Sequence, residues 1–191
     1  MSDVPTTAHL SEQDLARLAD QLHRAVQGEV RFDSGSRALY ATDGSLYRYL
    51  PLGVVLPRTE EDVRQTLSIC RAAGVPILPR GGGTSLAGQT CNTAVILDFS
   101  KYLNRVVQLD PDRRLVRVQP GCVLDRLRAA AEEHHLTFGP DPSTHNHNCL
   151  GGMLGNNSCG VHSIMAGRTV DNVRSLRVIT YDGLELTVGP T

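Results

Sequence analysis

A run of glycines and small hydroxyl residues follows an apolar segment in the first half of the chain. It reads Pro79-Arg80-Gly81-Gly82-Gly83-Thr84-Ser85-Leu86-Ala87-Gly88. Successive glycines allow backbone conformations that are closed to other residues, and they leave no side chains to block a ligand. Inward-turned amides form a nest for an anion, to which Thr84 and Ser85 add hydroxyl donors and Arg80 adds charge. The run therefore predicts a loop that holds a diphosphate.

Two familiar phosphate-binding loops do not match this run. A Walker A loop ends in Gly-Lys-Ser/Thr, and no lysine lies nearby. The dinucleotide fingerprint Gly-x-Gly-x-x-Gly, counted from Gly81, needs a glycine where Leu86 stands, and no helix pattern follows. A solvent-exposed glycine turn without a ligand stays open as the alternative.

A second glycine-rich segment covers residues 139–160. Glycines, small polar groups and paired asparagines alternate there with few large residues. Such a segment suits a backbone that wraps closely around a polar ligand, because its amides and asparagine side chains can hydrogen-bond to the ligand's oxygens. Taken alone, it is equally well explained as a tight polar loop bonded to itself. It contains Gly139-Pro140-Asp141-Pro142-Ser143 and Leu150-Gly151-Gly152-Met153-Leu154-Gly155-Asn156-Asn157-Ser158-Cys159-Gly160.

Histidines in and after this segment are candidate metal ligands. His145, His147 and Cys149 alternate along a short stretch, but a zinc site usually needs a fourth donor, and none is evident. We therefore expect no metal and interpret the stretch as a polar loop against a ligand. For His162, a surface or hydrogen-bonded histidine is the better interpretation.

Apolar periodicity predicts the elements that position these segments. Apolar residues that recur at helical spacing, short apolar runs and turn signals together indicate a mixed α+β fold. The predicted elements are a helix from Ser11 to Val26, an ordered connecting segment over 32–50, a strand over Val54–Leu56, a helix from Thr59 to Ala73, strands over Val75–Leu78 and Ala94–Asp98, a strand pair over Arg105–Leu109 and Leu115–Gln119, a helix from Val123 to His134, and a hairpin of Val173–Tyr181 with Leu184–Val188.

Composition restricts the class of protein. The 191 residues suffice for one ordinary domain or two small lobes that share a core. The 19 basic and 20 acidic residues are spread along the chain, which argues against a nucleic-acid or membrane-surface protein. No apolar run is long enough to span a bilayer, and residues 1–9 lack the pattern of a secretory signal, so we expect a cytoplasmic protein. Five irregularly spaced cysteines fit reduced thiols.

The two glycine-rich segments together resemble the FAD-binding domain of the vanillyl-alcohol oxidase superfamily, also called the PCMH-type fold. Within it, the chain looks most like the D-2-hydroxyacid dehydrogenase and glycolate oxidase branch. The resemblance runs from about Leu50 to Val188. It rests on the 80–88 loop, the 140–160 segment, the strand entry Thr169–Val173, and Val54–Pro57 with the helix after it. It implies a two-lobed α+β fold with FAD as the cofactor.

The resemblance also implies which residues contact FAD. The first loop of that family binds the pyrophosphate through backbone amides, and the second segment lines the rest of the cofactor. Covalent members carry a flavin-linking histidine in the first loop, where this chain has Thr84, and a thioether to Cys149 is the other conceivable link. We expect non-covalent FAD and assign no catalytic residue. The implied contacts are Arg80, Gly81, Gly82, Gly83, Thr84 and Ser85 in the loop, and Pro140, Asp141, Ser143, Gly151, Gly152, Asn156, Asn157 and Gly160 in the segment.

The domain organisation follows from the same resemblance. An N-terminal helix and connecting segment over 1–49 precede an FAD-binding domain over 50–191, with lobes of about 50–110 and 111–191. Family enzymes continue into a substrate domain whose histidines orient and deprotonate the hydroxyacid. Since this chain stops at Thr191, we expect a fold truncated at its C-terminal end, inactive alone and without the substrate domain.

The implied reaction is hydride transfer from a D-2-hydroxyacid of the lactate, glycolate or 2-hydroxyglutarate class to FAD. Electrons would pass to a downstream acceptor or an iron–sulfur domain. Two alternatives stay open. One is an NADPH-dependent reductase of the cell-wall precursor type on the same fold. The other is a non-catalytic module that binds a nucleotide diphosphate.

Overall fold

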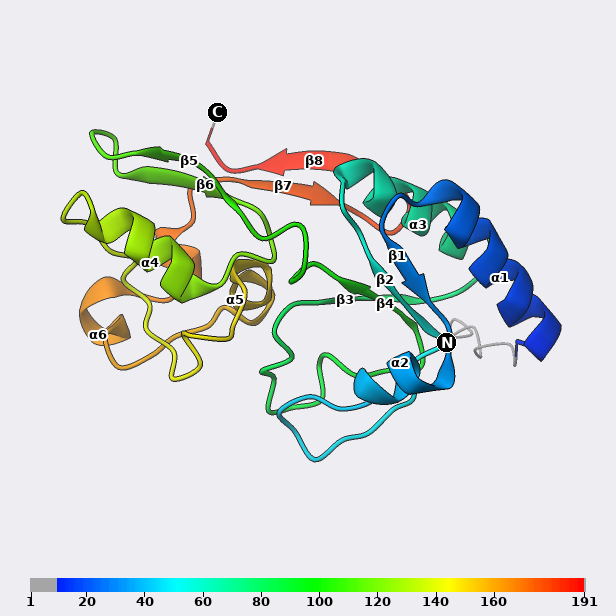
Figure 1. The fold of residues 1–191 in the computed structure, drawn as a ribbon. Coiled ribbons are helices and arrows are strands. Elements are labelled where there is room, and N and C mark those ends of the chain that lie inside the picture. The colour runs from blue at the N-terminus through cyan, green and yellow to red at the C-terminus, as the bar shows by residue number, and fades with distance from the viewer. Residues whose placement is uncertain (1–9, 191) are drawn as a thin grey trace, which may run out of the picture.

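The first lobe is built on a four-stranded sheet in the order β1-β2-β4-β3 (Figure 1). The computed structural model describes residues 10–190. Strands β2 (Gly53–Leu56), β4 (Val95–Asp98) and β3 (Ile77–Arg80) run parallel, and β1 (Glu29–Arg31) pairs antiparallel with β2 at the edge. Every residue of β2 and β4 is buried, as in parallel sheets covered on both faces. This coverage explains why both strands are short continuous apolar runs in the sequence.

Helices cover both faces of this sheet. α1 (Glu12–Ala25) and α3 (Glu60–Ala72) lie side by side on one face (Figure 1), where Leu22 and Leu67 enter the main core. α2 (Ser34–Leu39) packs against β2 near the smaller core on the other face. The N-terminal helix therefore belongs to the first lobe's core.

The carboxylate of Asp62 ties α3 to the turn between α1 and β1. Asp62 is 1% exposed. Its Oδ1 accepts from the backbone N–H of Gln27 (2.9 Å), and its Oδ2 accepts from the N–H groups of Arg58 (2.7 Å) and Thr59 (3.2 Å). In return, the Thr59 hydroxyl accepts from the Asp62 N–H (3.1 Å), which completes a capping box. One buried carboxylate thus pairs backbone donors of two segments.

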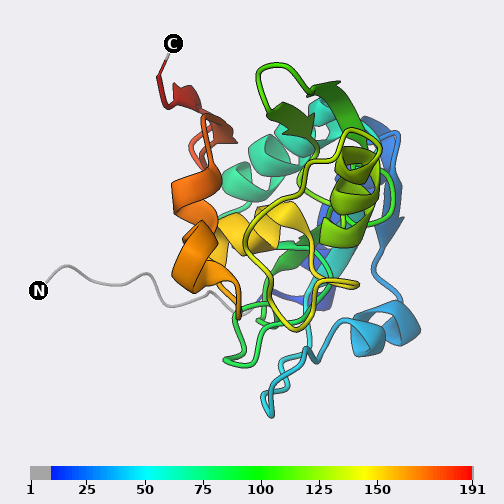
Figure 2. The same cartoon turned by 90° about the vertical axis from the view of Figure 1, so that its left-hand side faces the viewer.

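A second lobe follows β4 and has a small core of its own. Leu124, Leu127 and Met153 are each at most 2% exposed there. Figure 2 looks onto this lobe, with α4 (lime), α5 (yellow) and α6 (orange) towards the viewer. Its elements are β5 (Val106–Asp110), β6 (Leu115–Val118), α4 (Leu124–Glu132), α5 (Leu150–Asn156), α6 (Ser163–Ala166) and the 3-10 turn Thr169–Asn172.

The last hairpin of the chain packs back onto the first lobe. It consists of β7 (Leu176–Ile179) and β8 (Glu185–Val188). The guanidinium of Arg64 on α3 donates to the carboxylate of Glu185, and the Tyr181 hydroxyl donates to a backbone carbonyl between α3 and β3 (2.8 Å).

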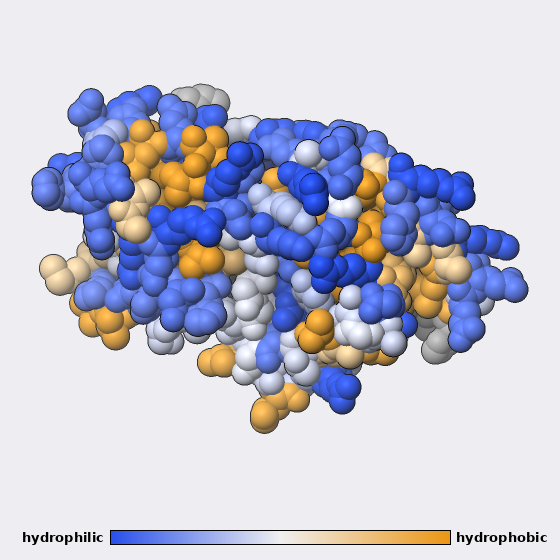
Figure 3. Space-filling model, in the orientation of Figure 1, coloured by the Kyte–Doolittle hydropathy of each residue, from blue (hydrophilic) through white to orange (hydrophobic). Residues whose placement is uncertain are grey.

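Apolar surface on the side shown in Figure 3 occurs in separate groups among polar residues. No helix in residues 10–190 is long and apolar enough to cross a bilayer.

The structure confirms the predicted helices and strands, with β3 lying two residues later than predicted and so including Pro79 and Arg80, and it adds others. Strand β1 precedes the connecting segment, and helix α2 interrupts it. Helix α5 occupies a stretch predicted as a loop. Elements of three to seven residues are too short to show a period in the sequence. The division of the chain at residues 49 and 110 stays a prediction.

We expect Asp62→Ala to lower the free energy of unfolding by about 3 kcal/mol, because it removes a helix cap and leaves buried N–H groups without an acceptor. Urea denaturation measures this change. The matched control is Glu12→Ala, which removes an exposed carboxylate from the first turn of α1. A loss for Asp62→Ala as small as that of the control would contradict the role assigned to this carboxylate.

Candidate functional site

The two glycine-rich segments meet where β3 ends. A Cβ atom on Gly82 would lie 2.1 Å from the carbonyl oxygen of His147, and one on Gly81 would lie 2.7 Å from the Cβ of Cys149. Real Cβ atoms do not approach other atoms this closely, so only glycine allows the two backbones to touch here. The triple glycine therefore serves first to join the two lobes.

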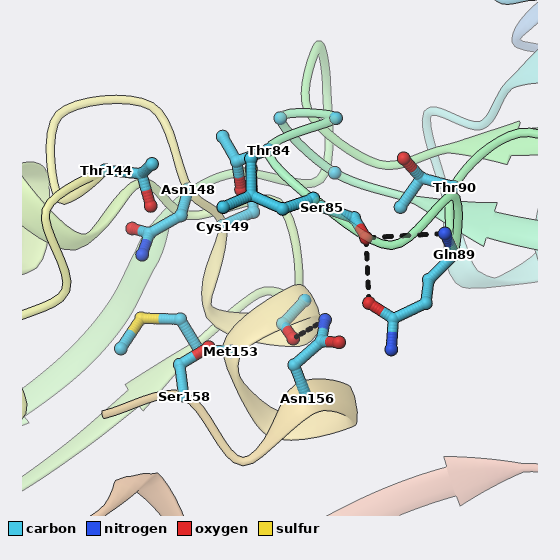
Figure 4. A pocket seen from close by; sticks show the side chains of 15 residues that line it. Thr84, Ser85, Gln89, Thr90, Thr144, Asn148, Cys149, Met153, Asn156 and Ser158 are labelled. Atoms are coloured by element: carbon cyan, nitrogen blue, oxygen red, sulfur yellow. Dashed lines mark hydrogen bonds between the residues drawn. The ribbon is translucent and has the colours of Figure 1, made fainter. Parts of the chain in front are cut away.

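A cavity of about 200 Å³ opens at this junction (Figure 4). It is lined by the loop after β3, by residues before α5, and by one face of α5. All its lining side chains are uncharged. The predicted contacts that it brings together are Gly81, Gly82, Gly83, Thr84, Ser85, Gly152 and Asn156.

The loop presents backbone donors without partners. Gly83 adopts a left-handed conformation (φ +66°), which turns the chain there. Within residues 10–190, the backbone N–H groups of Gly83, Thr84, Ser85 and Leu86 make no hydrogen bond. The Ser85 hydroxyl is instead used inside the loop, where it donates to the side-chain oxygen of Gln89 (2.7 Å; Figure 4). The free donors are thus mainly amides.

Arg80 does not line the cavity. Its guanidinium donates to the carbonyl oxygens of Thr90 (2.8 Å) and Thr42 (2.9 Å), and it lies 5.3 Å from the ring centroid of Tyr40. The Tyr40 hydroxyl donates to buried Asp98 (2.6 Å), and burial together with this hydrogen bond raises the pKa of Tyr40. Arg80 therefore ties the end of the loop, at Thr90, to the segment after α2, at Thr42.

Part of the second segment borders a different cavity. Asp141, Ser143 and Gly160 line an open cavity of about 560 Å³. The Asp141 carboxylate accepts from Arg128 (2.8 Å), which lowers the pKa of that carboxyl, and it lies 2.9 Å from Nδ1 of His162. This ion pair holds the start of the segment against α4.

The remaining predicted contacts line neither cavity. Pro140 is buried. Gly151 packs on Pro120 and donates its N–H to that residue's carbonyl (2.8 Å). Asn157 ends α5 in a left-handed conformation (φ 48°) and accepts from the N–H of Val170 (3.0 Å). These positions maintain the local backbone.

The sequence did not indicate that α5 is a helix. Glycine is a poor helix former, so Gly151 and Gly152 favoured a loop. A Cβ on Gly151 would lie 3.0 Å from Pro120, a tight contact that favours glycine there. The helix exposes Gly152 to the cavity. Other lining residues were not predicted either, and no pattern in the sequence distinguished them: Leu86, Gln89, Thr90, Thr144, Asn148, Cys149, Met153 and Ser158.

The histidines of the second segment have separate surroundings. Nδ1 of His145 lies 2.8 Å from the Asp125 carboxylate, and His147 is exposed. Across residues 10–190, no three His, Cys, Asp or Glu side chains gather closely enough to hold a metal ion.

A family model described as an FAD binding domain matches residues 51–189, most of the chain and both glycine-rich segments. The chain belongs to this FAD binding domain family. It is 35% identical over 163 residues to D-2-hydroxyglutarate dehydrogenase of Pseudomonas putida, covering 84% of this chain and 16% of that protein. It is 37% identical over 153 residues to glycolate oxidase subunit GlcD of Escherichia coli, covering 78% of this chain and 30% of that subunit.

Solved structures confirm the fold of this FAD binding domain. p-Cresol methylhydroxylase matches with a TM-score of 0.78 at 17% identity, covering 95% of this chain and 36% of that one. The 4-ethylphenol oxidase of Gulosibacter chungangensis matches with a TM-score of 0.78 at 20% identity, covering 94% and 35%. The PCMH-type fold predicted by resemblance is therefore correct, and the chain spans a minor part of the proteins it matches.

The surroundings of the cysteines predict selective alkylation. Burial raises the pKa of Cys149 to about 11, whereas Cys159 is exposed. Because only the thiolate reacts, very little Cys149 is reactive at pH 8. We expect iodoacetamide to label Cys159 of the native protein first, and Cys149 labelling to rise about tenfold per pH unit towards pH 11. Peptide mass spectrometry measures both rates, with Cys159→Ser as the control. Equal rates at pH 8 would contradict the burial of Cys149.

Proposed function

We propose that this chain holds FAD non-covalently, with the diphosphate in the cavity between the two glycine-rich segments. The observation that carries this proposal is the run of unpaired N–H groups from Gly83 to Leu86. Diphosphate oxygens only accept hydrogen bonds, so they are natural partners for such a run. A cavity of about 200 Å³ is smaller than the roughly 300–1,000 Å³ of pockets that enclose whole ligands. It therefore suits the middle of the dinucleotide.

Among the residues implied by resemblance, we propose two kinds of role. Those that line the cavity contact the diphosphate directly, chiefly through loop amides. Arg80 acts as a positioning residue, because its guanidinium already binds carbonyl oxygens on two other segments. Asp141, Ser143 and Gly160 border the second cavity and are proposed to face a more distant part of FAD. Pro140, Gly151 and Asn157 shape the backbone between these parts.

We further propose that the protein to which this domain contributes oxidises a D-2-hydroxyacid. The named substrates of the two relatives, 2-hydroxyglutarate and glycolate, are both 2-hydroxyacids, which supports this class. FAD, when bound, supplies the hydride acceptor. This chain's own residues bind the diphosphate and fix the cofactor's position. A quinone, an electron-transfer protein or an iron–sulfur domain is proposed to receive the electrons.

FAD binding has a direct test. We expect gel-filtered protein to retain visible flavin absorbance and to melt at a higher temperature with FAD than without it. All flavin should leave on acid precipitation, because the link is non-covalent. Since the cavity has no charged side chain, raising salt from about 50 to 500 mM should change the Kd by less than about twofold. A folded protein that gains neither absorbance nor stability would refute the proposal. Stabilisation by ADP as large as that by FAD would favour a nucleotide-diphosphate module.

The contact between the segments has its own test. We expect Gly82→Ala to weaken FAD binding at least tenfold and to cost about 1–3 kcal/mol of stability, because its Cβ would push the two backbones apart. Gly155→Ala is the matched control, since Gly155 lies on α5 with open space around it. That control should raise stability by up to about 1 kcal/mol and leave FAD affinity unchanged. Unchanged FAD binding in Gly82→Ala would contradict the assigned site.

The substrate class is tested with flavin-loaded protein under anaerobic conditions. The assay is run on this chain and on a longer one that also contains sequence corresponding to the rest of its relatives. Bleaching of the flavin in the longer protein by D-2-hydroxyglutarate, D-lactate or glycolate, and not by NADPH, is the expected result. Bleaching by NADPH alone would support the reductase alternative.

A further inference from the structure

Asn148 has an unpaired amide inside the cavity that we propose as the diphosphate site. The residue directly precedes the N-cap of α5 and is 6% exposed. Its Oδ1 is sealed from solvent without a hydrogen-bond partner. Its Nδ2 likewise makes no hydrogen bond within residues 10–190, but it is not sealed, so it is reachable from the cavity that Asn148 lines (Figure 4).

An asparagine that leaves both amide atoms unpaired is unfavourable for the fold. Buried polar groups are normally paired, and an unpaired one costs about 1–3 kcal/mol. A purely structural asparagine at this position would use its amide to bind neighbouring backbone, as Asn157 does with Val170. The sealed Oδ1 has no access to a ligand, so it is the accessible and unpaired Nδ2 that points to a partner outside the chain.

The accessible atom defines the chemistry of that partner. An Nδ2 group donates and does not accept, so its partner must offer an acceptor. The same cavity contains the free amides of Gly83 to Leu86, which also only donate. A ligand group with several acceptor oxygens can pair with both Nδ2 of Asn148 and these amides. The cavity has no charged side chain that would compete for such a group.

We infer that Nδ2 of Asn148 donates a hydrogen bond to a diphosphate oxygen of the bound dinucleotide. This inference rests on the proposed function and adds a side-chain donor from the second segment to the backbone donors of the first. The diphosphate then contacts both lobes. Its binding would strengthen their junction at Gly82 and His147.

The first test replaces Asn148 by leucine, whose branched shape is similar and which has no polar atom. We expect the Kd values for FAD and for ADP to rise about 10- to 100-fold, because a hydrogen bond to a charged group is lost. We also expect the free protein to melt at the same or a higher temperature, because the unpaired Oδ1 is removed. Isothermal titration and thermal unfolding measure the two changes. Asn146→Leu, an exposed position on the same segment, is the matched control and should change neither.

The second variant, Asn148→Asp, keeps the shape and places a carboxylate beside the diphosphate. It should weaken FAD and ADP more than Asn148→Leu does. Four results would overturn the inference while wild-type protein binds FAD: unchanged affinity in Asn148→Leu, a lowered melting temperature in that variant, wild-type affinity in Asn148→Asp, or a loss for FAD without a loss for ADP. Failure of wild-type protein to bind FAD would instead refute the proposed function.

Discussion

The close approach of Gly82 to the His147 carbonyl is the contact on which the rest of this structure depends. The carbonyl lies where any other residue would place its Cβ atom, so the backbones of the two lobes touch without side chains between them. The cavity exists because the loop after β3 must turn away immediately beyond this contact, and Gly83 supplies the left-handed conformation for that turn. The same loop therefore forms both the contact between the lobes and a wall of the cavity. The contact requires glycine at position 82 for space, and the turn requires glycine at position 83 for its conformation.

The site is polar yet carries no charge on its lining side chains. The sequence predicts that Arg80 adds charge to a diphosphate site, but its guanidinium is already hydrogen-bonded to the carbonyls of Thr42 and Thr90 and lies near Tyr40. Its effect on a ligand would be indirect, through the position of the loop. Recognition by amides depends on geometry more than on long-range attraction. Such a site favours a ligand whose oxygen atoms match the positions of the amides over a simple anion.

The unpaired polar groups of the site differ in burial, because residues 83–86 are half-buried or exposed whereas Oδ1 of Asn148 is sealed. The free N–H groups after Gly83 and the amide of Asn148 are polar groups that the chain does not satisfy by itself. In residues 10–190, Nε of Arg128 is the other side-chain nitrogen or oxygen that is sealed without a partner, whereas the carboxylate of Asp62 pairs three backbone N–H groups. Local departures from full hydrogen bonding are expected where a protein is built to meet a ligand. A bound acceptor would pair the loop N–H groups and Nδ2 of Asn148 and would strengthen the junction, while the sealed Oδ1 stays unpaired.

The sequence by itself determined α1, α3, β2 and β4, and it predicted the loop over residues 81–85 as a diphosphate site. Apolar period, capping residues and consecutive glycines are local signals, because each depends on neighbours within about one helical turn or one strand. The sequence also led to the correct family, through motifs in a fixed order. Only the tertiary structure decided that residues 150–156 form a helix, that Arg80 faces away from the cavity, and that Asn148 lines it. Those facts arise from contacts between residues far apart in the chain, such as Gly82 with His147 and Gly151 with Pro120. No local pattern encodes which distant backbone will occupy the space that a glycine leaves.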